Sequence, residues 1–277
     1  MIDRKRLGFI GAGNMAAAML NGILKNKLFR PEDIIIFDTD KRKLEGLCSS
    51  TGIVPAENNR YLAESTDLII LAVKPIYIES VLKEIKGALT ENHTLVSIAA
   101  GVKTDFLREK TEGRCRVIRT MPNTPAMVGE GMTAVCRSAG IPEDIMEQIE
   151  RIFLSFGRVE FMEEGMLNAA TALSGSSPAY VFLLIEAMAD GGVLMGLPRD
   201  LSYRLSAQAV LGAAKMVLES GRHPGELKDM VCSPGGTTIE AMQVLEKNGV
   251  RNAVIEAVKA CTEKADRMGK DKKDEGD

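Results

Sequence analysis

The chain has 277 residues, 45% of them hydrophobic and 26% charged, which is enough for one large domain or two moderate ones with an ordinary core. Its formal net charge of −3 excludes a global basic field that would recruit nucleic acid or an anionic membrane surface. We therefore expect neither kind of partner.

Few residues suit metal or nucleophilic chemistry. The two histidines, His93 and His223, both lie in polar or Pro-containing turns, which disfavours a His-rich zinc site and a Ser-His-Asp triad. The five cysteines form no CxxC pair, so we expect reduced and mostly buried thiols. We predict no metal site, and we expect a cofactor to supply the chemistry.

The N-terminal residues do not have the pattern of a secretory signal peptide. The polar residues 1–6 lead into a glycine-containing strand without an apolar stretch and cleavage site, and no run of about 18 uninterrupted apolar residues follows. These features predict a cytoplasmic protein. Residues 270–277 mix Lys, Asp and Glu and predict a disordered tail.

The first half alternates strands with helices. Short apolar runs predict strands at residues 7–10, 34–38, 68–73, 94–98 and 117–120, and further strands at 132–136 and 159–162. Helical spacing predicts helices at 14–27, 41–49, 78–85 and near 143–155. Repeated strand–helix units with short turns are typical of a doubly wound parallel sheet, and we assign residues 1–163 to it.

The strand pattern stops after about Glu163. Helices are predicted at residues 169–173, 179–194, 200–218, 226–231, 239–245 and 250–268. The helix at 179–194 is apolar nearly all round, and such a helix must be buried on all faces. A domain of about 110 residues has a limited interior. We therefore expect residues 164–269 to form an all-α domain that packs against a second subunit.

The first glycine-rich turn follows the first predicted strand and opens a helix. In the pattern Gly11-x-Gly13-x-x-Ala16, the glycines permit a tight turn and a close backbone approach to a pyrophosphate, and the small third residue permits close helix–strand packing. The backbone N–H groups of the first helical turn complete such a site. This predicts a dinucleotide site that includes Gly11, Ala12, Gly13, Asn14 and Met15.

The sequence leaves the choice between NAD(H) and NADP(H) open. Asp38 ends the second strand, where an acidic side chain holds a ribose 2′-hydroxyl and repels a 2′-phosphate. Lys41, Arg42 and Lys43 follow immediately, and these cations either bind a 2′-phosphate or form an exposed helix face.

Two later turns lie at the ends of predicted strands, where open α/β sheets bind ligands. The small or rigid residues of these turns allow a ribose and a nicotinamide to approach the backbone. They are Ala72, Val73, Lys74 and Pro75 in one turn and Ala99, Ala100 and Gly101 in the other.

A second glycine-rich turn, Ser233-Pro234-Gly235-Gly236-Thr237-Thr238, opens a helix in the C-terminal half. Free N–H groups and the helix dipole at such a turn favour an anion. A plain helix–helix turn with a Thr N-cap is the alternative. Two anion-binding turns in one chain favour an enzyme with a phosphate-containing cofactor and a carboxylate substrate.

In both glycine-rich turns and in several other motifs, the chain resembles pyrroline-5-carboxylate reductase over about residues 7–265. The motifs that carry the resemblance are FIGAGNMA at 9–16, LAVKP at 71–75, AAGV at 99–102, MPNTP at 121–125, LSGSSPAY at 173–180, DGGV at 190–193 and SPGGTT at 233–238. The chain departs from the family at Ser177, where glycine is usual.

The resemblance implies an N-terminal Rossmann-like domain and a C-terminal helical domain that interlocks with a second subunit in a dimer, sometimes within a decamer. It implies hydride transfer from NADPH, or often NADH, to the imine carbon of 1-pyrroline-5-carboxylate, giving L-proline. Asn59 matches a contact to the adenosine side of the cofactor. The substrate site implied by the two serine-containing motifs comprises Ser176, Ser233, Gly235, Gly236, Thr237 and Thr238, with the Thr238 hydroxyl near the imine nitrogen.

Two other functions fit parts of the sequence. A dehydrogenase of the hydroxyacid type generally uses a lysine in its helical domain, for which Lys215 and Lys228 are the mid-domain candidates, and neither lies in a glycine-rich turn. A non-catalytic dinucleotide sensor would bind NAD(P)H without needing the Ser233 and Thr238 hydroxyls.

Overall fold

A computed structural model of the chain describes residues 6–138 and 140–270. The chain divides into two compact units after Ser176 and again after Ala260, so that residues 177–260 form the second unit and the residues on either side of them form the first. The tail predicted for residues 270–277 lies, apart from Lys270, outside the described residues, and so do residues 1–5.

The first unit contains an eight-stranded sheet with the strand order β3-β2-β1-β4-β5-β6-β7-β8. In this order, every neighbouring pair from β3 to β6 is parallel, as predicted. The strands are β1 (Leu7–Ile10), β2 (Ile34–Phe37), β3 (Val54–Pro55), β4 (Leu68–Leu71), β5 (Thr94–Ser97), β6 (Arg116–Met121), β7 (Gly131–Cys136) and β8 (Gly157–Met162).

The parallel prediction fails for one pair, because β7 runs antiparallel to β6. Only residues 122–130 join these strands, including the 3-10 helix η3 (Thr124–Val128), and a parallel crossover needs a dozen or more residues. Helix α6 provides such a crossover between β7 and β8, which are parallel.

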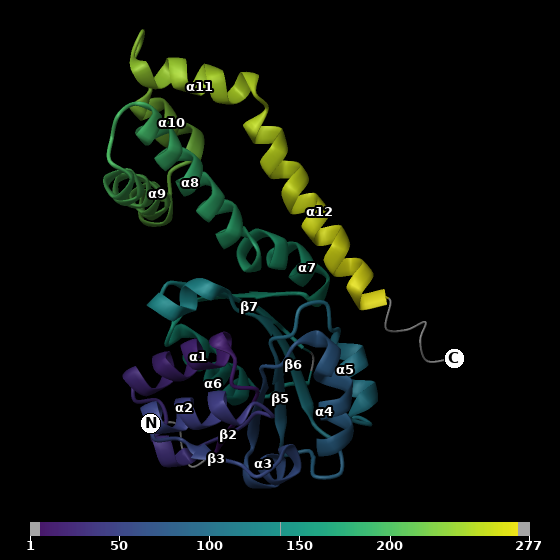
Figure 1. Ribbon diagram of the computed structural model, residues 1–277. Helices are drawn as coiled ribbons and strands as arrows, with labels where there is room; N and C mark the ends of the chain where they lie inside the picture. Colours follow the sequence, from purple (N-terminus) through teal and green to yellow (C-terminus); the bar gives the residue numbers. More distant parts are fainter. Residues whose placement is uncertain (1–5, 139, 271–277) are drawn as a thin grey trace. The chain divides into compact units, whose positions relative to one another are not determined.

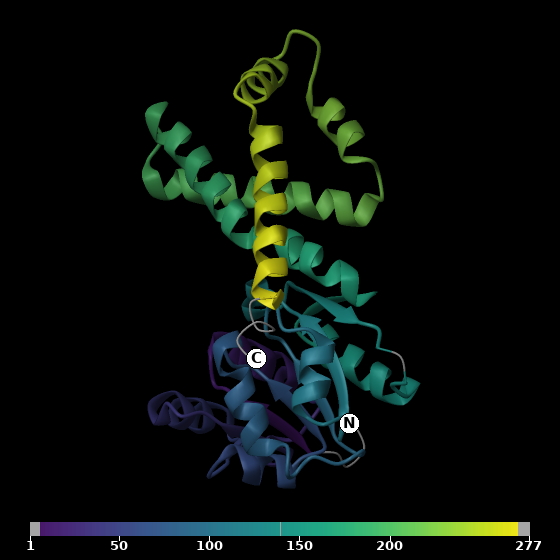
Figure 2. The same cartoon turned by 90° about the vertical axis from the view of Figure 1, so that its right-hand side faces the viewer.

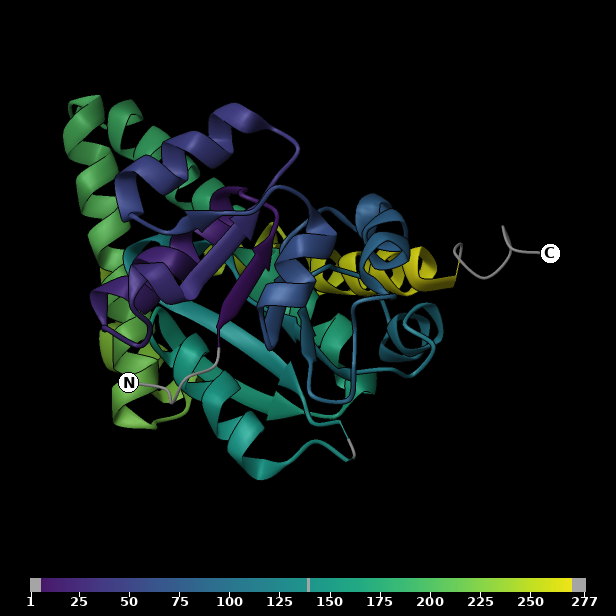
Figure 3. The same cartoon turned by 90° about the horizontal axis from the view of Figure 1, so that it is seen from below.

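Helices cover both faces of the sheet (Figures 1 and 3). One core packs β-strand side chains such as Phe9 against α1, α2 and α6, and the other packs side chains such as Ile69 against α3, α4 and α5. The helices of this unit are α1 (Asn14–Lys25), α2 (Lys41–Thr51), α3 (Asn59–Ser65), α4 (Ile78–Ile85), α5 (Thr104–Lys110), α6 (Glu143–Leu154) and α7 (Leu167–Ala170), with the short 3-10 helices η1 (Pro31–Asp33), η2 (Pro75–Tyr77) and η4 (Glu164–Met166).

The second half is helical, as predicted. A π-helical turn, η5 (Thr171–Gly175), follows α7 and ends at the predicted break before Pro178. The remaining helices are α8 (Ser177–Leu194), α9 (Arg199–Ser220), α10 (Pro224–Val231), α11 (Thr237–Lys247) and α12 (Val250–Lys270). The predicted fold class, an α/β Rossmann-like domain followed by an all-α region, is therefore confirmed.

Helix α8 is the most apolar element of the second unit and is largely exposed in the single chain. It packs against α9, and Figure 2 shows the two green helices crossing. Phe182 and Leu183 are 64% and 66% exposed. Among the described residues, one helical stretch, Glu164–Leu194, has the length and hydropathy that a membrane span requires, which is weak evidence on its own.

Candidate active site

The turn between β1 and α1 has the geometry of a dinucleotide-binding loop. Gly11 has a φ of +108°, and a Cβ at this position would lie 2.6 Å from the Ala72 carbonyl oxygen, so only glycine fits. Gly13 is the N-cap of α1 with an extended backbone. Apart from its chain neighbours, no heavy atom of the described residues lies within 4 Å of a Cβ built on Gly13. The turn is therefore rigid at Gly11 and open to a ligand at Gly13.

A cleft of about 480 Å³ opens at the carboxyl ends of β1, β2 and β4. Crevices at this edge of an open parallel sheet are where such folds bind cofactors. The structure brings several predicted cofactor-binding residues together in its wall, namely Gly11, Gly13, Asp38, Asn59, Ala72, Val73 and Lys74.

The other predicted cofactor-binding residues do not line this cleft. The N–H group of Ala12 donates to the Asp38 carboxylate over 2.7 Å, and Asn14 and Met15 begin α1. Pro75 opens the 3-10 helix η2 after β4. Residues 99–101 follow β5, at the same edge of the sheet.

The cleft also contains polar residues that the sequence reasoning missed. Tyr77, Ser80 and Glu84 lie three and four residues apart at and along α4, so they share one side of that helix. Asp40, the N-cap of α2, was also missed, whereas Lys43 in the first turn was already a candidate cation for a 2′-phosphate. The three- and four-residue spacing of Tyr77, Ser80 and Glu84 could be recognised in the sequence. Their position at the cleft could not, because only the fold brings that helix to the glycine turn.

The polar contacts inside the cleft are well defined. One oxygen of Asp38 accepts from Ala12, and the other accepts from the N–H of Asp40 over 2.8 Å. The Asn59 amide nitrogen donates to Glu84 over 2.8 Å. The amide oxygen of Asn59 is buried without a hydrogen-bond partner among the described residues. Such an orphan acceptor fits a ligand that brings a donor.

The second glycine-rich turn belongs to the second unit and joins α10 to α11. Gly235 has a φ of +68°, and the Gly236 N–H donates to the Ser233 carbonyl over 3.0 Å. Gly236 is the N-cap of α11, and in the described chain no side chain caps that helix. The alternative of a Thr N-cap is therefore wrong, because Thr237 is already the first helical residue. Thr238 is half-buried, and Ser233, Gly235 and Thr237 are exposed.

Ser176, the remaining predicted substrate residue, belongs to the first unit and follows the π-helical turn. Its hydroxyl oxygen accepts from the Cys261 thiol over 3.2 Å. The side chain of Asn123 donates to the carbonyl of Ser174 over 2.9 Å and ties this turn to the loop after β6. The Ser176 hydroxyl is thus paired with α12, and the turn before it is held by the loop after β6.

The histidines and cysteines have structural surroundings. His93 accepts from the Thr90 N–H at Nδ1 and pairs at Nε2 with the Ala63 carbonyl, both over 3.0 Å. His223 caps α10 through Nδ1. Both are turn residues, as predicted. All five cysteines are free, and burial raises the pKa of the Cys115 thiol to about 11.

The candidate lysines of a hydroxyacid dehydrogenase occupy exposed helix surfaces. Lys215 pairs with Glu219 over 3.5 Å, and Lys228 pairs with Asp229 over 3.0 Å. Each lysine is thus paired with a neighbouring carboxylate, and Lys228 also lines an open hollow beside α11.

Comparison with known proteins agrees with both halves of the fold. A family model for pyrroline-5-carboxylate reductase dimerisation matches residues 164–268, and a model for NADP oxidoreductase, coenzyme F420-dependent, matches residues 6–101. A curated pyrroline-5-carboxylate reductase from Escherichia coli K12 is 47% identical over 266 residues, which are 96% of this chain and 99% of the relative. The chain belongs to the pyrroline-5-carboxylate reductase family. This confirms the resemblance carried by the motifs.

Other members of the pyrroline-5-carboxylate reductase family extend the agreement. One from Methanosarcina acetivorans is 42% identical over 97% of this chain and 100% of its own length. A solved structure of the Plasmodium falciparum enzyme with NADP bound superposes with a TM-score of 0.89 at 35% identity, covering 97% of this chain and 100% of that one.

Proposed function

We propose that this chain reduces 1-pyrroline-5-carboxylate to L-proline, the last step of proline biosynthesis, as an NAD(P)H-dependent oxidoreductase. The observation that carries the proposal is its match to named pyrroline-5-carboxylate reductases over nearly the whole of both chains. The open glycine turn and its cleft support the cofactor half of the reaction.

The cofactor-binding residues are those of the first unit. The turn at Gly11, Ala12 and Gly13 and the N-terminus of α1, at Asn14 and Met15, hold the pyrophosphate. Asp38 and Asn59 hold the adenosine ribose. Residues 72–75 and 99–101 line the side of the ribose and nicotinamide. A reduced nicotinamide bound by these residues would supply the hydride for the imine carbon of the substrate.

The substrate-binding residues are the turn at 233–238 and Ser176. The uncapped N-terminus of α11 offers N–H groups to the substrate carboxylate, with Gly235 and Gly236 leaving the backbone accessible. The hydroxyls of Ser233 and Thr237 contribute further hydrogen bonds. Thr238 orients the imine nitrogen, and Ser176 contacts the substrate. A cyclic imine that arrives protonated needs no histidine acid, and orientation alone supplies on the order of 7–11 kcal/mol at best.

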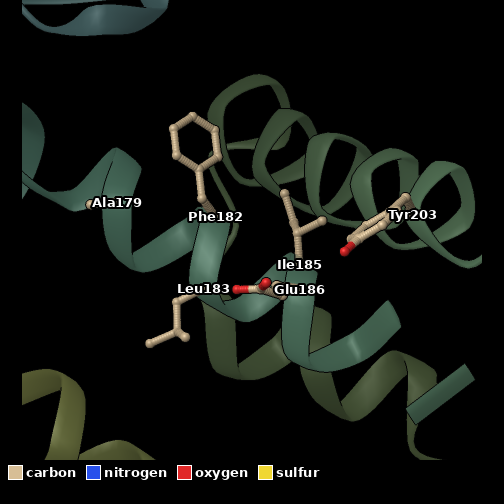
Figure 4. Close-up of a pocket in the computed structure, with 6 residues that line it drawn as sticks. All are labelled: Ala179, Phe182, Leu183, Ile185, Glu186 and Tyr203. Carbon is tan, nitrogen blue, oxygen red and sulfur yellow. The ribbon is translucent and has the colours of Figure 1, made fainter. Parts of the chain in front are cut away.

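The functional form is a homo-oligomer, with a dimer as the smallest unit and a decamer as a larger form, in the cytoplasm. An open apolar pocket of about 460 Å³ lies over α8 and α9 (Figure 4). Phe182 and Leu183 project from α8 beside it, with Tyr203 supplied by α9. Covering such side chains with a second chain removes them from water. The match of the dimerisation model supports this assignment over a membrane contact.

The same match supports a domain division into residues 1–163 for the cofactor and 164–269 for substrate and dimerisation, with a tail at 270–277. In this arrangement the turn at 233–238 meets the nicotinamide of the partner subunit, which makes dimerisation a requirement for activity.

The test is NAD(P)H oxidation in the presence of 1-pyrroline-5-carboxylate. Thr238→Ala is expected to lower kcat by about 10- to 100-fold, since it removes one positioning or proton-transfer group. Thr238→Ser is the matched control, because it keeps the hydroxyl and should stay near the wild-type rate. Dinucleotide binding without turnover would assign the chain to the sensor class instead, and an unchanged kcat in Thr238→Ala would remove the role of that hydroxyl.

A further inference from the structure

The adenosine end of the cofactor cleft is lined by hydrogen-bond acceptors. Carboxylates come from two segments: Asp38 and Asp40 in the connection between β2 and α2, and Glu84 on α4. The amide nitrogen of Asn59 donates to Glu84 over 2.8 Å, and this bond fixes the orientation of the amide group. The oxygen of Asn59 is therefore the buried acceptor without a partner, on a side chain only 5% exposed. A wall of this kind accepts hydroxyl donors and repels an anion.

The Asp38 carboxylate is also held in place. Its two oxygens accept backbone N–H groups from Ala12 over 2.7 Å and from Asp40 over 2.8 Å. These two bonds keep the carboxylate beside the glycine turn. The side chain has to remain where a ribose 2′-substituent lies when the pyrophosphate occupies that turn.

The two features that would bind a 2′-phosphate are already occupied. The N–H groups of Arg42 and Lys43, at the start of α2, donate to the Asp40 carboxylate over 3.1 and 3.3 Å. The ammonium group of Lys43 pairs with the same carboxylate over 3.3 Å. Hydrogen bonds from the Lys43 N–H and side chain hold the pKa of Asp40 below its ordinary value. Lys41 and Arg42 do not line the cleft. Asp40 thus serves as an internal anion at the position where a phosphate would otherwise bind.

We propose that this chain selects NAD(H) over NADP(H), with Asp38 and Asp40 as the specificity-determining residues. The proposal rests on the proposed function only in that the cleft holds a nicotinamide dinucleotide. Asp38 and the free oxygen of Asn59 accept from ribose hydroxyls, and Asp40 fills the helix N-terminus. NADP(H) remains a weaker ligand, since Lys43 can leave Asp40 and pair with a phosphate.

The experiment measures binding without substrate, so that it is separate from turnover. Dissociation constants for NADH and NADPH are determined by titrating the wild-type protein and following nicotinamide fluorescence, and those for NAD+ and NADP+ by calorimetry. We expect the 2′-phosphorylated forms to bind about 10- to 100-fold more weakly, the effect of replacing a charged hydrogen bond by a like-charge contact. The discrimination should shrink with added salt.

Three variants identify the cause. Asp38→Ser should bring the two dissociation constants to within a few-fold of each other, and Asp40→Ser should narrow the ratio by freeing Lys43 and the helix N-terminus. Glu45→Gln is the matched control, because it removes an exposed negative charge from α2 outside the cleft. Its ratio should equal that of the wild type.

Equal or tighter binding of NADPH by the wild-type protein would overturn the inference and leave the proposed function intact. A ratio that Asp38→Ser leaves unchanged would overturn the assignment of the residues. Binding of neither dinucleotide would overturn the proposed function together with the inference.

Discussion

Gly11 and Gly13 lie in the same turn but have different surroundings. Replacing each by alanine should therefore affect stability in the first case and cofactor binding in the second. At Gly11 a Cβ would lie 2.6 Å from a backbone oxygen of Ala72, and the φ of +108° is unfavourable for any L side chain. Strain of about 1–3 kcal/mol adds to an overpacking cost of similar size. We expect Gly11→Ala to lower the free energy of unfolding by about 2–6 kcal/mol.

Gly13→Ala should behave differently. Its φ of −75° and ψ of 178° suit alanine, and the new methyl group meets no heavy atom of the described chain within 4 Å, chain neighbours aside. Alanine is a poorer N-cap than glycine, which costs several tenths of a kcal/mol. Alanine also restricts the unfolded chain, which stabilises the folded state by about 0.4–1 kcal/mol. These terms nearly cancel, so the free energy of unfolding should change by less than about 1 kcal/mol.

The methyl group of Gly13→Ala instead enters the space left for the pyrophosphate. Because one or two charged hydrogen bonds to the pyrophosphate are lost, the dissociation constant of the dinucleotide should rise by about 10- to 100-fold or more. Urea denaturation without ligand measures the first quantity, and fluorescence titration with NADH measures the second. A Gly13→Ala protein that binds NADH as tightly as the wild type would refute the placement of the pyrophosphate at this turn.

Three further variants test other parts of the account. Leu183→Glu places a charge on the exposed face of α8 and should shift the mass measured by light scattering toward that of one chain; an unchanged mass would argue against this interface. Arg119→Met removes a guanidinium that is 2% exposed and donates to Asn168 over 2.6 Å, and should cost about 3 kcal/mol of unfolding free energy, whereas the exposed control Arg151→Met should cost less than about 0.5. The Cys115 thiol has its ordinary pKa of 9.0 in the unfolded chain and a pKa of about 11 in the folded chain. The unfolded chain therefore loses this proton first, and the free energy of unfolding falls by about 2–3 kcal/mol as the pH rises from 9.0 to about 11. In urea denaturation at pH values between about pH 8 and about pH 10.5, the free energy of unfolding of Cys115→Ala should fall less steeply with pH than that of the wild type. An unchanged dependence on pH would contradict the assignment.

The elements of the first unit were predictable where burial is two-sided. The strand Leu68–Leu71 is buried at every position, so it is a continuous apolar run in the sequence. The two-residue strand Val54–Pro55 was missed, because its residues are exposed and proline marks an edge. The direction of β7 was also missed, since strand propensity does not report direction and only the short connection to β6 decides it.

The candidate site was predictable where its chemistry is local in sequence. Gly11, Gly13 and Asp38 were predicted because the turn and the strand end are neighbouring features of one βαβ unit. Glu84 was missed because its part in the cleft depends on Asn59, 25 residues away, to which it is hydrogen-bonded. The question that Asp38 and Lys43 left open in the sequence depends on a local contact instead, since Lys43 pairs with Asp40 three residues before it.

The central claim is that a hydride passes from the nicotinamide to the imine carbon of the pyrroline ring. The direct measurement uses NADH carrying deuterium at C4 of the nicotinamide, with 1-pyrroline-5-carboxylate, and analyses the product by mass spectrometry and NMR. We expect L-proline with one deuterium at C5 when the transferred position is labelled, and an unlabelled product from the opposite C4 epimer. Oxidation of NADH with the deuterium absent from C5 of proline under both labels, or no proline at all, would contradict it.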